Sequence, residues 1–93
     1  MANDVKVLKL ITGEELITRM TESDNGFLIL EKPMFFTMGA PNATGKLGIG
    51  MVDWIMAGKA DKVTIEAKHI LVILDPKSEM EKTYLSRITG LSL

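Results

Sequence analysis

The spacing of turn signals along the first 76 residues is the feature that most restricts what this chain can fold into. Short runs rich in Val, Ile, Leu and Thr are interrupted about every 8–12 residues by glycine-containing breaks. Two of these breaks are Thr12-Gly13-Glu14 and Asn25-Gly26, where glycine can adopt the positive φ angle that tight turns require. Several short antiparallel strands joined in this way predict a small, partly open β-barrel.

The apolar runs between the breaks locate the strands. They are, in chain order, two strands within Val5–Met20, a strand over Phe27–Met38, and strands at Met51–Ala57, Val63–Glu66 and Ile70–Leu74. Pro33 lacks an amide hydrogen, so it predicts a bend in the third strand. The glycine-rich segment Gly39–Gly50 predicts a loop. Ile70–Leu74 is almost unbroken Ile, Leu and Val, which is typical of a strand buried on both faces or in a subunit interface.

The sequence pattern changes to a helical period after Asp75-Pro76. Ser78 followed by Glu81 forms a capping box, and Gly90 is placed to end the helix, so we expect a helix within residues 77–91. One stripe of this helix carries its apolar residues, Met80, Tyr84, Leu85, Ile88 and Leu91. We expect this stripe to pack as a lid over one mouth of the barrel. The alternative is a helix that binds a partner or a membrane surface, and the polar face lacks the Lys and Arg that favour a membrane.

Length and charge exclude several classes of protein. The 93 residues fit one domain, with a barrel over residues 5–76 and the helix after it. Eleven basic and twelve acidic residues give a net charge of −1, which argues against tight binding to duplex DNA. The absence of Cys excludes disulfides and thiolate chemistry. The start of the chain has no signal peptide and no run long enough to span a membrane, so the expected location is the cytoplasm.

No motif for catalysis, cofactor or metal emerges. Gly39–Lys46 resembles a phosphate-binding loop, but five residues separate its outer glycines and Leu47 stands where a hydroxyl is needed. His69 is the only imidazole, which makes a zinc site improbable without Cys, and no Ser lies in a nucleophile elbow. We therefore expect neither an enzyme nor a bound cofactor.

Residues 5–76 resemble the Sm and LSm proteins, including bacterial Hfq, and are most similar in pattern to the small Sm-like proteins of marine T4-like phages. The first Sm motif resembles Leu10–Ile17 followed by Asp24–Leu30, which combine apolar strands with a Gly turn and an Asp-containing turn. The second resembles Ile65–Ile73, in which Lys68-His69 is similar to the Lys-His pair of Hfq. The chain departs from the usual pattern at Glu66-Ala67, where Arg-Gly is common, and its helix follows the barrel instead of preceding it.

This resemblance implies a five-stranded, strongly bent antiparallel Sm-like barrel that assembles into a homo-oligomeric ring. Neighbouring subunits would join when the fourth strand of one pairs with the fifth strand of the next, and Ile70–Leu74 fits that interface. A ring would repeat Lys68 around its central pore, so that a near-neutral chain could still bind single-stranded RNA or DNA. If the chain is phage-encoded, its location would be the host cytoplasm.

Four residues are the candidates for nucleic-acid binding. Phe27 and His69 could stack on unpaired bases, while Lys68 and Asn25 could hold a phosphate or a base edge. Each has a structural alternative: Phe27 in the core, Asn25 as a turn residue, and Lys68-His69 in a solvated corner. The alternative function is a structural or protein-interaction ring, for example an assembly component of a phage or its host, that binds no nucleic acid.

Overall fold

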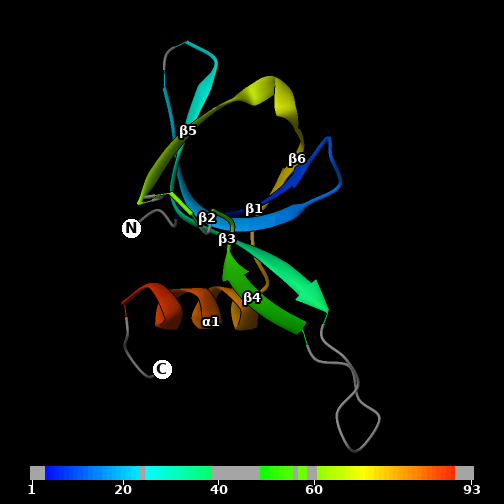
Figure 1. Cartoon of the computed structure of the whole chain (residues 1–93), viewed down its shortest axis with the longest axis vertical. Helices are drawn as coiled ribbons and strands as arrows, with labels where there is room; N and C mark the ends of the chain where they lie inside the picture. The colour runs from blue at the N-terminus through cyan, green and yellow to red at the C-terminus, as the bar shows by residue number, and fades with distance from the viewer. Residues whose placement is uncertain (1–3, 24, 39–48, 56, 59–60, 90–93) are drawn as a thin grey trace, which may run out of the picture.

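The fold is a single curled antiparallel sheet with one helix packed against it (Figure 1). The structure, a computed structural model, describes residues 4–23, 25–38, 49–55, 57–58 and 61–89. In this part of the chain the strands are β1 (Val5–Leu10), β2 (Glu15–Glu22), β3 (Phe27–Met38), β4 (Ile49–Asp53), β5 (Lys62–Glu66) and β6 (Ile70–Leu74). A 3₁₀ turn, η1 (Ala67–His69), joins β5 to β6, and the helix is α1 (Ser78–Thr89).

The long strand β3 organises the sheet. Its first half, Phe27–Glu31, pairs with β5, and its second half, Met34–Met38, pairs with β4. The remaining neighbours follow in the order β3, β2, β1, β6, all antiparallel. The sheet curls so that β5 and β6 face each other across the interior of the barrel, which Figure 1 shows. The predicted bent, mostly β barrel with a C-terminal helix is thus confirmed, with β4 and β5 as two separate strands along β3.

The bend in β3 occurs beside Pro33, as predicted, and the strand continues through it. Lys32 has a φ of +49°, an uncommon value for a residue other than glycine, and the pairing of β2 with β3 shifts register between Ile17 and Arg19. This combination is a β-bulge, which adds a residue to one strand and turns its direction. The bulge lets one strand serve both the barrel wall and the β4 extension.

Two separate apolar clusters lie on opposite faces of the sheet, because side chains alternate along each strand. The inner cluster fills the barrel and contains buried Leu8, Leu10, Leu16, Leu28 and Leu30. The outer cluster lies under α1 and contains Val5, Ile17, Met34, Met51 and Tyr84, with Met80, Leu85 and Ile88 packed against it. The expected apolar stripe of the helix is therefore confirmed within the described residues. The prediction that the helix packs as a lid over a barrel mouth was wrong, because α1 covers the outer wall (Figure 1). The outer face of β1–β3 is itself apolar, and it attracts the helix.

Tyr84 fastens α1 to the bulge. Its side chain is fully buried, and its hydroxyl donates to the carbonyl oxygens of Glu31 (2.8 Å) and Lys32 (3.0 Å). The same hydroxyl accepts the backbone N–H of Arg19 at 3.1 Å. Burial raises the pKa of Tyr84 above its usual value of 10.0, although the hydrogen bond from Arg19 opposes the rise. Tyr84 thus bonds backbone groups on both strands of the bulge, and the Thr18 hydroxyl donates to the same Glu31 carbonyl oxygen at 2.9 Å.

Some predicted boundaries differ from the structure. The fourth strand covers Ile49–Asp53 and not Met51–Ala57, so Trp54 lies just beyond it. The chain turns at this point because the Trp54 N–H bonds to the carbonyl oxygen of Pro33 at 3.1 Å. The end of the predicted loop Gly39–Gly50 was wrong, because Ile49 and Gly50 belong to β4. The rest of that loop, and Gly90 and Leu91 after the helix, lie outside the described residues.

Gly26 occupies the β2–β3 turn with a φ of +75°. A Cβ added there would meet no atom within 4 Å, so the cost of Gly26→Ala comes from the dihedral angle alone. We expect this substitution to lower the free energy of unfolding by about 1–2 kcal/mol, measured by urea denaturation. Gly58→Ala, at a glycine without a positive φ, is the control and should change stability by less than about 0.5 kcal/mol. Equal effects at the two glycines would contradict this explanation.

Candidate nucleic-acid interface

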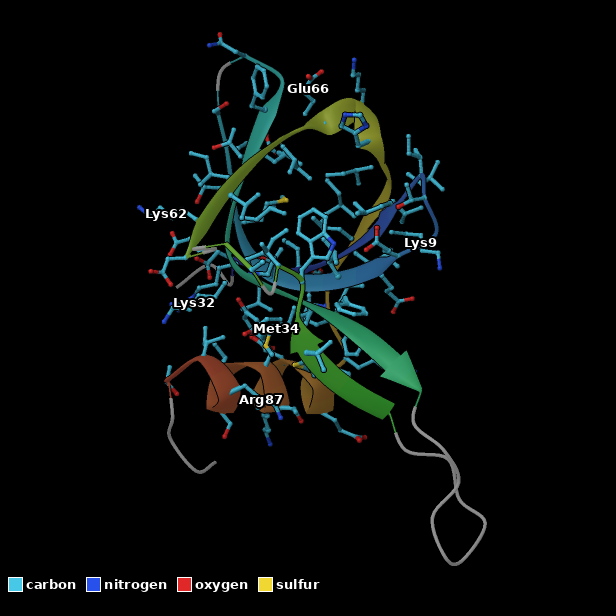
Figure 2. The ribbon with its side chains drawn as sticks, in the orientation of Figure 1. Lys9, Lys32, Met34, Lys62, Glu66 and Arg87 are labelled. Atoms are coloured by element: carbon cyan, nitrogen blue, oxygen red, sulfur yellow. The ribbon has the colours of Figure 1, made fainter. Side chains whose placement is uncertain are left out.

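The β2–β3 turn and η1 are held side by side at one end of the barrel. The N–H of Ala67 donates to the carbonyl oxygen of Gly26 at 2.9 Å, and Phe27 pairs with Glu66 at the end of the β3–β5 ladder. Figure 2 shows Glu66 at the rim of the barrel, at the end of the molecule opposite α1 and Arg87. The fold therefore joins two segments that lie about forty residues apart in the sequence.

All four predicted site residues belong to these two segments, and all four are exposed. Asn25 lies in the turn, and Phe27 begins β3 with 38% of its surface exposed, so the alternative of a core Phe27 does not apply to the isolated chain. The Ser23 hydroxyl and the Ser23 N–H both donate to the Phe27 carbonyl oxygen at 3.0 Å. These bonds close the turn and limit the positions that the Phe27 side chain can take.

Lys68 and His69 occupy η1, which is anchored at both ends. Ala67 bonds to the β2–β3 turn, and the His69 carbonyl oxygen accepts the Ile11 N–H at 2.9 Å. The backbone of the corner is fixed in this way while both side chains remain exposed to solvent. A fixed backbone with free aromatic and basic side chains suits a ligand that is recognised by stacking and by charge.

The charge balance at this end is mixed. Lys68 Nζ lies 3.2 Å from Glu66 Oε2, and both side chains are well exposed. Such an exposed ion pair contributes little to stability, roughly 0–1 kcal/mol, because water and salt screen it. The Lys68 ammonium can therefore leave Glu66 for a phosphate at a small cost in free energy.

A second polar feature of the barrel was not predicted from the sequence. Trp54 Nε1 donates to Glu14 Oε2 at 2.9 Å, and the Thr12 hydroxyl donates to Glu14 Oε1 at 2.9 Å. Beside this pair is a cavity of about 200 Å³ lined by Leu10, Ile11, Thr12, Glu14, Trp54, Ile65 and His69. The partners Glu14 and Trp54 are forty residues apart, and the only sequence signal was that Trp54 is the single tryptophan.

Strand β6 carries a run of exposed large apolar side chains along an unpaired edge. This strand pairs with β1 on one side only, and Leu71 and Leu74 are 63% and 58% exposed. Val72 and Ile73 between them are also exposed. A free strand edge with apolar side chains on both faces is typical of a surface that another strand covers.

Among the residues that the structure describes, no group of three or more His, Asp or Glu side chains is arranged to hold a metal ion. The one described helix, α1, is too short to cross a membrane.

Comparison with known proteins places the chain in a family. No curated protein matches the chain. A family model, the Sm-like domain, matches residues 7–85, which include all of the barrel except the first two residues of β1 and more than half of α1. The helix after the barrel thus lies largely within the region that the family model matches. The bent antiparallel barrel, the two joined corners and this match together show that the chain belongs to the Sm-like family.

Proposed function

We propose that this protein is a non-catalytic ring of identical subunits that binds single-stranded RNA at its central pore. Single-stranded DNA, which has the same backbone charge, is the alternative ligand. The Sm-like family generally forms oligomeric rings and binds RNA, which supports the class of function. The observation that carries the proposal is the junction of the β2–β3 turn with η1, which gathers exposed Asn25, Phe27, Lys68 and His69 at one rim.

The proposed assembly uses the unpaired edges of β5 and β6. In each described chain β5 pairs only with β3 and β6 pairs only with β1, so each strand keeps one edge open. When β5 of one subunit pairs with β6 of the next, every subunit uses both of these edges and a closed ring leaves neither of them unpaired, while β4 keeps its own outer edge. Burial of Leu71 and Leu74 would stabilise that contact.

Binding in the ring depends on repetition of a modest site. A single Lys68 beside Glu66 attracts phosphate weakly, and the chain carries a net charge of −1. A ring presents one Lys68 and one His69 from each subunit around the same pore, so the contacts to one strand add together. Bases stack on the rings of Phe27 and His69, each contributing roughly 1–3 kcal/mol. The proposed role is RNA processing or regulation in the cytoplasm. If the resemblance to phage proteins reflects the source, that cytoplasm is a host's.

The function is tested by titrating fluorescent oligo(U) with the protein at low salt. We expect wild type to bind, and the double variant Lys68→Ala, His69→Ala to bind at least about tenfold more weakly, because it loses a phosphate contact and a stacking ring. Lys82→Ala removes an exposed charge from α1, away from the rim, and should leave affinity unchanged. No binding by wild type, or equal binding by the double variant, would contradict the proposal.

That negative outcome would favour a ring that serves assembly or protein interaction without nucleic acid. The Lys68–Glu66 ion pair is the observation that favours this second candidate, because it neutralises the one lysine of the corner. In that case the ring would still form, and the double variant would behave as wild type in every assay of assembly.

A further inference from the structure

We propose that the cavity between Glu14 and Trp54 is a base pocket that selects guanine. This inference deepens the proposed function, because it assigns a base preference to a strand that passes His69. The pocket is lined by side chains from the end of β1, the β1–β2 turn, the residue after β4, β5 and η1. Asn25, Phe27 and Lys68 of the rim do not line this pocket. His69 is the rim residue that does.

The pocket offers hydrogen-bond acceptors, the carboxylate oxygens of Glu14. Glu14 is half-buried, and none of the described Lys, Arg or His side chains forms an ion pair with it. A carboxylate offers about four acceptor positions, and Trp54 and Thr12 use two of them, one on each oxygen. Each oxygen of Glu14 therefore keeps a position for a further donor, in a site that is partly shielded from water.

The geometry of the carboxylate is fixed before a ligand arrives. The turn that carries Glu14 is closed by two backbone bonds of 2.9 Å, from the Leu10 N–H to the Glu14 carbonyl oxygen and from the Gly13 N–H to the Leu10 carbonyl oxygen. The Trp54 indole and the Thr12 hydroxyl then hold the side chain itself. A preorganised acceptor loses little conformational entropy when a donor binds to it.

Size and shape favour a single planar ring system. The cavity of about 200 Å³ is smaller than the roughly 300–1,000 Å³ typical of pockets for drug-sized ligands. Its walls are Leu10, Ile11, Ile65 and the Trp54 side chain, which offer apolar contact to a base. Aromatic side chains bind unpaired bases by stacking while polar groups read the base edge.

Guanine is the base whose edge matches two neighbouring acceptor oxygens. Its Watson–Crick edge carries the N1–H and the N2 amino group side by side, so it can donate to both oxygens of Glu14. Uracil has one N–H between two carbonyl oxygens that a carboxylate repels. Adenine and cytosine each place a ring-nitrogen acceptor beside their amino group. The cavity therefore discriminates among the bases through Glu14, whereas the rim binds through charge and stacking.

The first arm of the experiment uses Trp54 as its own reporter, because it is the only tryptophan. Wild-type protein is titrated with guanosine, uridine, adenosine and inosine monophosphates while its fluorescence is recorded. We expect guanosine monophosphate to quench Trp54 at the lowest concentration. Inosine lacks the N2 amino group and should bind about tenfold more weakly, since a bidentate contact is lost. Equal responses to guanosine and uridine monophosphates, or a preference for adenosine, would overturn the proposal.

The second arm tests the pocket in a strand. An oligo(U) carrying one internal guanosine should bind about tenfold more tightly than oligo(U) itself. Glu14→Gln should abolish this difference while preserving affinity for oligo(U), because an amide keeps one acceptor and adds a donor. Glu15→Gln, the same change at the exposed neighbouring residue, should retain the guanosine preference. A preference that survives Glu14→Gln would refute the assignment.

The two arms separate this inference from the proposed function. If no oligonucleotide binds but guanosine monophosphate quenches Trp54, the strand-binding function fails and the guanine pocket stands. If oligo(U) binds and neither arm shows a guanine preference, the pocket fails and the function stands. A pocket that prefers a free guanidinium compound to guanosine monophosphate would also overturn the nucleobase assignment.

Discussion

Replacing Leu71 and Leu74 of β6 by glutamate is expected to yield a folded monomer where the wild-type chain forms a ring. Both side chains are more than half exposed in the isolated chain, at 63% and 58%, so the monomer loses little when they become polar. In the ring they would be buried against a neighbouring subunit, where an unpaired carboxylate is strongly unfavourable. Light scattering at micromolar concentration measures the mass, and circular dichroism verifies the fold.

A matched control separates assembly from charge. Ile11 and Ile55 are also exposed apolar residues, and neither belongs to β5 or β6. The double variant Ile11→Glu, Ile55→Glu adds the same charge and should remain a ring. A wild-type chain that scatters as a monomer would exclude the ring, and with it the repetition of Lys68 that the proposed binding needs.

Tyr84→Ala should have the largest effect on the stability of the single chain. It removes a fully buried aromatic side chain from the outer cluster, and truncations of this size typically cost about 3–5 kcal/mol. Tyr84→Phe keeps the ring but removes the hydroxyl that bonds the Arg19 N–H and the Lys32 carbonyl oxygen, while the Glu31 carbonyl oxygen keeps the Thr18 hydroxyl; the expected cost is about 1–3 kcal/mol. Urea denaturation of the three proteins measures both values.

The pH dependence of unfolding provides an independent test of the buried hydroxyl. Burial raises the pKa of Tyr84 in the folded chain above the 10.0 of an unfolded tyrosine. The folded state therefore holds this proton more tightly, so the stabilisation is complete below pH 10 and is lost as the pH rises through the folded pKa. Wild type should lose stability in this range more steeply than Tyr84→Phe. Parallel curves for the two proteins would show that the phenol is not held as described.

The fold was largely predictable because its signals are local. Gly13 and Gly26 mark turns where φ is positive, and the helical stripe from Met80 to Ile88 packs as its spacing indicated. The rim could be predicted only through a family resemblance, because Asn25 and Lys68 carry no spacing of their own. It is the backbone bond between Gly26 and Ala67 that brings the two segments together.

Two features could not be predicted because they depend on distant partners. The helix was expected at the barrel mouth, since its apolar stripe does not reveal which apolar surface it meets. The strands β1 and β2 carry apolar residues on both faces, and only the curl of the sheet decides which face is the interior. The contact between Glu14 and Trp54 likewise arises because Trp54 leaves the strand after Asp53. The sequence pattern reveals neither the curvature of the sheet nor the point at which the chain leaves β4.

The arrangement of the two clusters on opposite faces of one sheet implies an order in which the molecule can form. The β1–β2 and β2–β3 pairings join neighbours in sequence and can close early, since short loops cost little entropy. The helix has only 12 residues, too few to persist by itself in water, and it needs the finished bulge to receive Tyr84. Because the inner cluster contains no helical residue, the barrel wall can mature first and α1 can dock last.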